Sequence, residues 1–321
     1  EPPMARKDRS PQELFAAAQG GDRAAVARLL SLIERGGDSA REVGRLSYPL
    51  GGHAYTVGLT GAPGAGKSTL TSATIGHIRS LGQEVAVLAI DPSSPFTGGA
   101  ILGDRVRMQD HATDPGVFIR SMATRGHLGG LSLATPEAVR LLDALGRELV
   151  LIETVGVGQV EVEIAGKADT TVVVVNPGWG DSVQANKAGL MEIADVFVIN
   201  KADRKGMEDT RRDLEQMLEL SEHSDWRPPI IPTIASQGEG VERFWQAVGE
   251  HREHITASGE LQKRRERRLR EELREIIVRR LEMRAREICT GDRWSELESG
   301  VSQRRIDPWG AADEMLKGVG A

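Results

Sequence analysis

One glycine-rich stretch fills every position of the pattern G-x-x-x-x-G-K-[ST]: Gly61-Ala62-Pro63-Gly64-Ala65-Gly66-Lys67-Ser68. An apolar, β-rich run precedes it over residues 55–60, and a helical stretch follows it over residues 69–81. In this strand–loop–helix setting, backbone N–H groups can close around a phosphate chain, and the helix N-terminus adds partial positive charge. Lys67 can reach the outer phosphates, and the Ser68 hydroxyl can ligate Mg²⁺. The sequence therefore predicts a nucleoside triphosphate site; the alternative is a glycine-rich turn that fits the pattern by accident.

A second loop indicates which nucleotide is bound. Asn200-Lys201-Ala202-Asp203 follows an apolar strand over residues 196–199. The Asp203 carboxylate can accept hydrogen bonds from the ring N–H and the exocyclic amino group of guanine. Adenine offers neither on that edge, so ATP would leave the carboxylate unpaired. The Lys201 stem can cover a face of the base, and Asn200 can tie this loop to the phosphate loop. We therefore expect GTP and GDP as ligands; an ordinary Asn/Asp turn is the alternative.

A third stretch, Ser236-Gln237-Gly238-Glu239-Gly240, follows a β-rich run over residues 230–234 and can form another wall of the base pocket. Together the three stretches define the residues expected to contact the nucleotide. These are Gly61, Ala62, Pro63, Gly64, Ala65, Gly66, Lys67, Ser68, Thr69, Asn200, Lys201, Asp203, Ser236, Gln237 and Gly238.

Carboxylates stand at the ends of two predicted strands between these loops. Asp91 follows the run 84–90, and Glu153 follows the run 149–152. Because the carboxyl ends of parallel strands converge on a ligand crevice, both can hold Mg²⁺ directly or through its waters. Asp104, beyond the loop after Asp91, is a further candidate. The alternative for Asp91 and Glu153 is that they only cap the turns that follow them. We expect Ser68, Asp91, Asp104 and Glu153 at the metal, Lys67 and the same carboxylates in catalysis, and Gln159 as a candidate for placing water.

Composition restricts the class of protein. The chain has 321 residues, enough for a full α/β core and a smaller accessory element. Its 41 Lys and Arg against 47 Asp and Glu give a formal net charge of −6, so no bulk attraction to nucleic acid is expected. The single cysteine, Cys289, excludes an internal disulfide framework and a cysteine metal cluster. Without a membrane-length apolar run or a signal-peptide core, we expect a cytoplasmic protein, or a mitochondrial matrix protein if a leader was removed.

The middle of the chain predicts the fold. Nearly continuous apolar runs alternate there with helical ones, which is typical of parallel strands covered on both faces. We expect an α/β fold with a mostly parallel P-loop sheet flanked by helices. The expected regions are an N-terminal helical segment (1–47), the nucleotide domain (48–256) and a C-terminal helical region (257–321). Within the first region, residues 11–35 predict two short amphipathic helices with a break at Gly20-Gly21. The predicted strands are 54–60, 85–90, 117–121, 148–153, 170–176, 195–200 and 230–234.

The combination of motifs closely resembles one family, the MeaB/ArgK-type GTPases that attend methylmalonyl-CoA mutase, within the SIMIBI class of P-loop GTPases. The resemblance is carried by residues 61–68, 91–95, 98–105, 125–131, 153–159 and 200–203, and extends to Asp307-Pro308-Trp309. It implies a GTPase that gates delivery of adenosylcobalamin to the mutase and protects the mutase from inactivation. It also implies that the metal-associated carboxylates of the family correspond to Asp91, Asp104 and Glu153.

The resemblance gives a role to residues 176–187. From the residues alone this stretch is a strand end, a glycine-rich loop and a polar helix start, with Asp181 as the N-cap. In the family it resembles an additional switch that relays the nucleotide state to the client, through residues that match Asp181, Gln184 and Lys187. Trp179 and Asn186 depart from the aliphatic residue and the isoleucine that the family pattern predicts.

The C-terminal region contains a long helix with an apolar stripe. Between residues 260 and 289 the chain is rich in Arg and Glu, with Leu269, Leu273, Ile276, Ile277 and Leu281 at helical spacing. A helix about 45 Å long cannot bury this stripe against itself. We expect a homodimer, which the resemblance also implies; a helix lying on its own nucleotide domain, or a solvated arginine-rich face, are the alternatives.

Other functions share parts of this pattern. A small-metabolite kinase would use the phosphate loop but has no need of a guanine-reading Asp203. A nickel- or zinc-inserting GTPase would share the fold, yet one cysteine and seven dispersed histidines supply no recognisable ligand set. A nucleotide-gated scaffold with slow hydrolysis is a third alternative.

Overall fold

The computed structural model describes residues 9–91, 111, 113–123, 130–154, 159–179, 184–220 and 225–317. By its internal contacts the chain divides into two compact units, Glu1–Arg265 and Glu266–Ala321. The boundaries predicted at residues 47 and 256 stay predictions. Across the described residues, we find no helix with both the length and the apolar character needed to cross a membrane.

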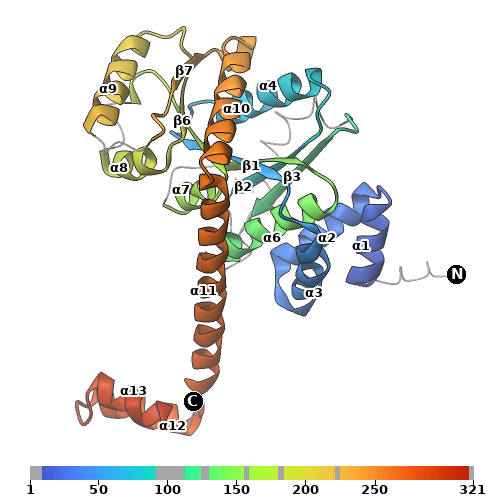
Figure 1. The fold of residues 1–321 in the computed structure, drawn as a ribbon. Helices are drawn as coiled ribbons and strands as arrows, with labels where there is room; N and C mark the ends of the chain where they lie inside the picture. Colours follow the sequence, from blue (N-terminus) through green and yellow to red (C-terminus); the bar gives the residue numbers. More distant parts are fainter. Residues whose placement is uncertain are drawn as a thin grey trace, which may run out of the picture. The chain divides into compact units, whose positions relative to one another are not determined.

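The first unit is built on a sheet of seven parallel strands in the order β3-β2-β4-β1-β5-β6-β7 (Figure 1). The α/β fold predicted from the apolar runs is therefore confirmed, with every strand within two residues of its expected ends. The strand that leads into the phosphate loop lies in the centre of the sheet. One of its two neighbours carries Glu153, and the other leads into residues 176–187. The strands are β1 (Tyr55–Gly61), β2 (Val85–Asp91), β3 (Val117–Ala123), β4 (Leu149–Thr154), β5 (Thr170–Val175), β6 (Val196–Asn200) and β7 (Ile230–Thr233).

Helices cover both faces of this sheet (Figure 1). Successive side chains of a strand point to opposite faces, and β2 shows this clearly. Val87 belongs to a core shared with Ile75 and Phe244, whereas Leu88 belongs to a second core shared with Leu141. In the described part of the chain, the helices between the strands are α4 (Lys67–Ser80), α6 (Gly130–Ala144), α7 (Gln159–Gly166), α8 (Gln184–Ile193) and α9 (Met207–Leu220), and α10 (Val241–Ala257) follows the last strand.

Three N-terminal helices precede the sheet: α1 (Pro11–Gln19), α2 (Arg23–Arg35) and α3 (Gly37–Ser47), the last followed by a short 3₁₀ turn, η1 (Tyr48–Leu50). Helices α2 and α3 pack onto α6, and α1 packs against α2 and α3. A capping box at Ser10 starts α1, and the Asp22 side chain caps α2. The break predicted at Gly20-Gly21 is confirmed. The third helix was not expected from the sequence, because Gly36-Gly37 resembles a helix breaker. It is stabilised by tertiary packing through its buried residues Ala40, Val43 and Ser47.

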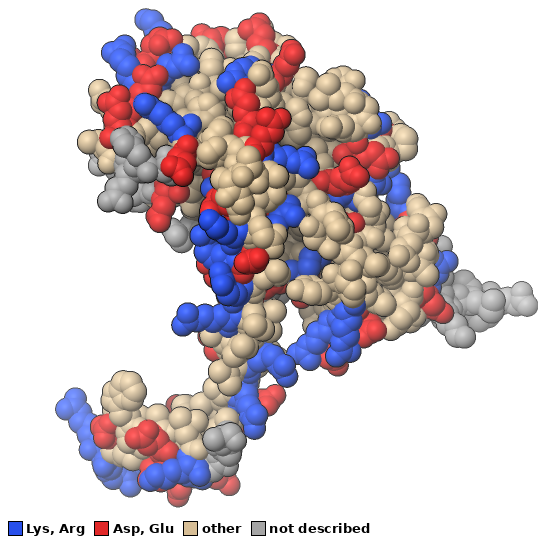
Figure 2. Space-filling model, in the orientation of Figure 1, with Lys and Arg blue, Asp and Glu red and all other residues tan. Residues whose placement is uncertain are grey.

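The second unit contains the greater part of α11 (Glu260–Ile288) together with α12 (Gly291–Ser302) and α13 (Pro308–Leu316). Basic side chains gather along α11 in Figure 2. The apolar stripe of this helix is exposed: Leu273 by 60%, Ile277 by 50% and Leu281 by 62%. In α12 and α13 only Gly300 and Ala311 are buried. The unit on its own therefore leaves most of its apolar surface open to solvent.

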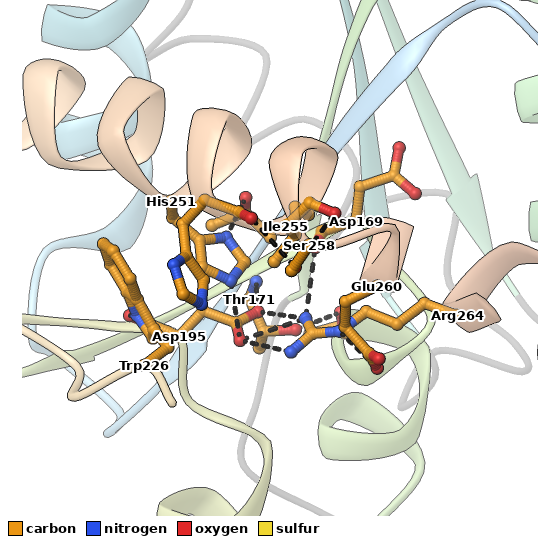
Figure 3. Close-up of polar contacts among 12 residues, drawn as sticks. Asp169, Thr171, Asp195, Trp226, His251, Ile255, Ser258, Glu260 and Arg264 are labelled. Atoms are coloured by element: carbon orange, nitrogen blue, oxygen red, sulfur yellow. Dashed lines mark hydrogen bonds and ion pairs between the residues drawn. The ribbon is translucent and has the colours of Figure 1, made fainter. Parts of the chain in front are cut away.

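A buried polar cluster ties the first turns of α11 to the amino-terminal ends of β5 and β6 (Figure 3). Arg264 donates to both carboxylate oxygens of Asp195, at 3.0 Å each. His251 of α10 lies against the same carboxylate, with its Nε2 3.2 Å from Asp195 Oδ1. Its Nδ1 is 2.8 Å from the Thr170 hydroxyl, which is in turn bonded to the Tyr55 hydroxyl.

Alkaline pH is expected to destabilise the protein through Tyr55, which is only 2% exposed. Burial, with the negative charge of Asp169 and Asp195, raises the pKa of Tyr55 to about 12 despite its hydrogen bond to Thr170. An unfolded tyrosine titrates near pH 10, so between about pH 10 and 12 the unfolded chain loses a proton that the native chain keeps. The free energy of unfolding should therefore be unaffected by this group below pH 10 and fall by roughly 2–3 kcal/mol as pH rises to 12.

Comparing the urea midpoints of three proteins at pH 9 and at pH 11.5 measures this effect. Tyr55→Phe should lose less stability between the two pH values than the wild type. Tyr48→Phe is the matched control, because Tyr48 is the other tyrosine of the chain and is 58% exposed. Equal pH sensitivity of Tyr55→Phe and the wild type would contradict the prediction.

Candidate nucleotide site

The phosphate loop connects the end of β1 to the start of α4. The backbones of β1 and β5 are in such close contact here that a Cβ on Gly61 would lie 1.9 Å from the carbonyl oxygen of Val174, so only glycine fits. Gly66 has φ of +89° and precedes the first turn of α4 as its N-cap. The loop therefore leads directly into the N-terminus of α4. A glycine-rich loop followed by a helix N-terminus is an arrangement that binds phosphate groups.

Lys67 lies along the inside of this loop. It is 8% exposed, and its ammonium donates to the carbonyl oxygens of Gly61 at 2.9 Å and Ala62 at 3.2 Å. These contacts hold a positive charge against the loop, where phosphate oxygens can replace the carbonyls.

Ser68 and Glu153 form the polar floor of the site. The Ser68 hydroxyl donates to Glu153 Oε1 at 2.6 Å, and Glu153 is 1% exposed. Asp91, 7% exposed, stands at the end of β2, on the other side of β4 from the phosphate loop. The structure thus brings Ser68 and Glu153 together as predicted, and places Asp91 at the same edge of the sheet. Asp104 lies outside the described residues.

These donors fit Mg²⁺, because a hydroxyl and carboxylates supply oxygen ligands only. Within the described part of the chain, no group of three or more His, Cys, Asp or Glu side chains is placed to hold a metal ion by itself. Ser68, Glu153 and Asp91 are the described residues that could hold such an ion together with nucleotide phosphates and water.

Asn200 joins the loop of residues 200–203 to the phosphate loop, as the sequence predicted. The side chain is 2% exposed, and its Nδ2 donates to the carbonyl oxygen of Ala65 at 2.8 Å. Its Oδ1 accepts from the Thr233 hydroxyl at 3.1 Å and from the amide of Ala235 at 3.0 Å. Thr233 and Ala235 were not predicted, because nothing in the sequence shows which residues lie beside Asn200 in the fold.

The remaining residues predicted for the base pocket lie on the loops that follow the neighbouring strands β6 and β7. Lys201 has φ of +60°, rare for a residue with a side chain, and its ammonium donates to the Gly64 carbonyl at 2.6 Å. Asp203 is exposed at the tip of the same loop. The expected third wall forms a 3₁₀ turn, η4 (Ala235–Gln237), closed by Gly238 with φ of +75°. Ser236 and Gln237 are exposed, so they and Asp203 can reach a base.

The structure leaves the switch residues largely untested. Asp181 lies outside the described residues, and Gln184 and Lys187 lie in α8 with no description of their side chains. Gln159 begins α7 with its side chain likewise undescribed. Trp179, the departure from the family pattern, is 2% exposed and belongs to the core that contains β1, β5 and β6.

Comparison with known proteins identifies relatives over nearly the whole chain. The sequence model of the family described as methylmalonyl Co-A mutase-associated GTPase MeaB matches residues 26–289. A putative GTPase of Pyrococcus abyssi is 50% identical over 311 residues, covering 96% of each chain. GTPase ArgK of Escherichia coli is 38% identical over 255 residues, covering 77% of each chain.

A mouse protein and a solved structure extend the comparison. The mitochondrial methylmalonic aciduria type A homolog of Mus musculus is 34% identical over 283 residues, covering 81% of this chain and 68% of the mouse protein. The crystal structure of a LAO/AO transport system kinase aligns with a TM-score of 0.72 at 25% identity, covering 98% of this chain and 99% of that one.

Proposed function

Since this chain belongs to the family of methylmalonyl-CoA mutase-associated GTPases, MeaB, we propose that it is a Mg²⁺-dependent GTPase whose nucleotide state controls an adenosylcobalamin-dependent mutase. GTP hydrolysis follows from the family itself. The Mg²⁺ requirement, the client and the dimeric state go further and are our proposal. The observation that carries the guanine part is the contact of Asn200 with Ala65, which fixes the loop of Asp203 at the rim of the phosphate loop.

The residues of the site have separable tasks in hydrolysis. We expect Lys67 to exchange the carbonyls of Gly61 and Ala62 for phosphate oxygens when GTP binds, and so to stabilise the charge of the transition state. Ser68 and Glu153, already joined by a hydrogen bond, would hold the cation or its waters at the buried end of the site. Mg²⁺, when bound, neutralises negative charge on the terminal phosphates.

Replacing GTP with ATP in a turnover assay tests the nucleotide specificity. A site that reads guanine through Asp203 should hydrolyse GTP in a Mg²⁺-dependent way and turn over ATP poorly. Comparable turnover of the two nucleotides would contradict the proposal and favour a small-metabolite kinase, which needs no guanine contact.

We propose that the client is methylmalonyl-CoA mutase and that the GTPase acts as its chaperone, gating cofactor loading and protecting the loaded enzyme. The support is the family description, together with the mouse relative that is named for methylmalonic aciduria. Co-purification with a cobalamin-dependent mutase, in GDP and in a non-hydrolysable GTP analogue, tests this. A mutase that binds in neither nucleotide state would rule out this client.

Lys187→Ala is expected to separate signalling from hydrolysis. Lys187 lies in α8, outside the two stretches of chain that form the nucleotide loops. We expect intrinsic GTP hydrolysis within a few-fold of the wild type and loss of most stimulation by the mutase, because a client acts by binding one arrangement of this segment better. Turnover with and without the mutase measures both rates. Equal loss of both rates would place Lys187 in the active site.

The α11 stripe is expected to be a homodimer contact. Replacing Ile276 and Ile277 with Asp would place carboxylates in an apolar seam, at a cost of several kcal/mol, and should yield monomers that still bind GTP. Arg286→Asp, at an exposed position of the same helix, is the control and should stay dimeric. Sedimentation at micromolar concentration measures the state; a monomeric wild type would refute the dimer.

A further inference from the structure

The loop that carries Asp203 is attached to the turn that follows β5. We call residues 200–206 the base loop and residues 176–179 the post-β5 turn. The amide of Gly178 donates to the Thr210 hydroxyl at 3.2 Å. Thr210 lies near the start of α9, and its own amide is bonded to the carbonyl of Gly206, the last residue of the base loop, at 3.0 Å. A short chain of contacts therefore runs from the base loop to the post-β5 turn.

The two backbones also pass near each other, with room between them for about one side-chain carbon atom. Gly206 and Gly178 have φ of +92° and +86°, conformations that residues with side chains rarely adopt. A Cβ on Gly206 would lie 3.8 Å from the Gly178 nitrogen and 3.9 Å from Pro177 Cβ. A displacement of one backbone here must be followed by the other or must break the hydrogen bond to Thr210.

Both partners of the contact are anchored in the core. Thr210 is 3% exposed, and Trp179, which follows Gly178, is 2% exposed. The Trp179 amide is bonded to the Asn176 carbonyl at 3.1 Å, which closes the turn on itself. Since neither end can shift freely into solvent, the Gly178–Thr210 bond is placed to transmit small rearrangements rather than to absorb them.

The base loop is held at both ends and exposed over residues 203–205. Asn200 fixes the first end on Ala65 of the phosphate loop, and Gly206 with Thr210 fixes the second end on Gly178. Asp203, exposed between them, is the residue that a guanine engages. A base that orders Asp203 therefore acts on a segment whose far end is joined to the post-β5 turn.

We propose that the post-β5 turn senses the guanine base as well as the phosphates, with Thr210 as the positioning residue that connects them. This deepens the proposed function and rests on it. By linkage, an arrangement of the turn that is favoured by the bound base must in turn change the affinity for that base. The affinity of a client that binds the chain beyond Trp179 would then depend on whether a complete guanine nucleotide is bound.

Hydrogen exchange at the Gly178 and Trp179 amides, with saturating GDP or saturating inosine diphosphate, tests this in the full chain. Inosine diphosphate carries the same phosphates but lacks the exocyclic amino group that Asp203 binds. Calorimetry first establishes saturation by each ligand. We expect exchange at these amides to be slower in GDP by about fivefold or more, the lower end of usual couplings. Inosine diphosphate keeps the ring N–H, so the comparison reports the contact of Asp203 with the amino group alone. Equal exchange in the two ligands would overturn the proposal.

Two substitutions at Thr210 separate sensing from binding. Thr210→Val keeps the shape and removes the hydroxyl, so the GDP–inosine diphosphate difference at the Trp179 amide should vanish while GDP still binds. Thr210→Ser retains the hydroxyl and should keep the difference. An undiminished difference in Thr210→Val would overturn the role of this residue. Failure of the wild type to bind GDP at all would instead overturn the guanine assignment on which the proposal rests.

Discussion

Asp203→Asn is expected to bind xanthosine triphosphate in preference to GTP. The wild-type carboxylate accepts hydrogen bonds from the ring N–H and the exocyclic amino group of guanine. The asparagine amide faces that amino group with a donor of its own, whereas the 2-oxo group of xanthine accepts from it. Hydrogen bonds to a charged group contribute about 1.5–3 kcal/mol each, so GTP affinity should fall by about a hundredfold or more.

Calorimetric titration of both nucleotides, with turnover assays at matched saturation, measures the exchange of specificity. Asp209→Asn is a suitable control, because Asp209 is an exposed carboxylate close by on α9 that pairs with Arg212. The control should bind GTP like the wild type. If Asp203→Asn kept full GTP affinity, the base would have to be recognised by another residue, and the interpretation of residues 200–203 would be wrong.

The fold was predictable because its signals are local. Most strands of the sheet contain a nearly continuous apolar run such as residues 172–175, and a run of this kind is typical of a strand covered on both faces, as β5 is. The third N-terminal helix was missed because its local signal is weak. Gly36, with φ of +71°, ends α2, and the next residues are polar; only the packing of Ala40 and Val43 makes them helical.

The nucleotide site divides in the same way. Gly66, Lys67 and Ser68 act through a short loop whose geometry the sequence pattern specifies, and Asn200 meets Ala65 as expected. The partners Thr233 and Gly178 could not be predicted, since each depends on which strand lies beside which. The polar cluster at the other end of the sheet could not be predicted either, because no local pattern indicates that Arg264 and Asp195, 69 residues apart in the chain, come together.

Removing Asp169 is expected to cause the largest loss of stability of any single change considered. Its side chain is 1% exposed and accepts from the Thr56 amide at 3.0 Å and from Arg265 at 2.7 Å. Burial acts to lower the pKa of Arg265, yet the bond and charge of Asp169 raise it above its ordinary value. Asp169→Ala would leave the buried Thr56 amide without its acceptor and the Arg265 guanidinium without its carboxylate partner, with only the carbonyls of Gly52 and Ala54 still bonded to it, at a cost of about 3–5 kcal/mol.

Thermal unfolding followed by circular dichroism should show this as a fall in Tm of about 6–15 °C. Asp209→Ala removes an ion pair at 2.9 Å whose side chains are 68% and 74% exposed, and it should cost less than about 1 kcal/mol. The same chemical change is thus compared in a buried and an exposed setting. Arg265→Met should restore part of the stability when added to Asp169→Ala, because it removes the charge left without a partner. Equal Tm values for Asp169→Ala and Asp209→Ala would show that the start of α11 is not held by this pair.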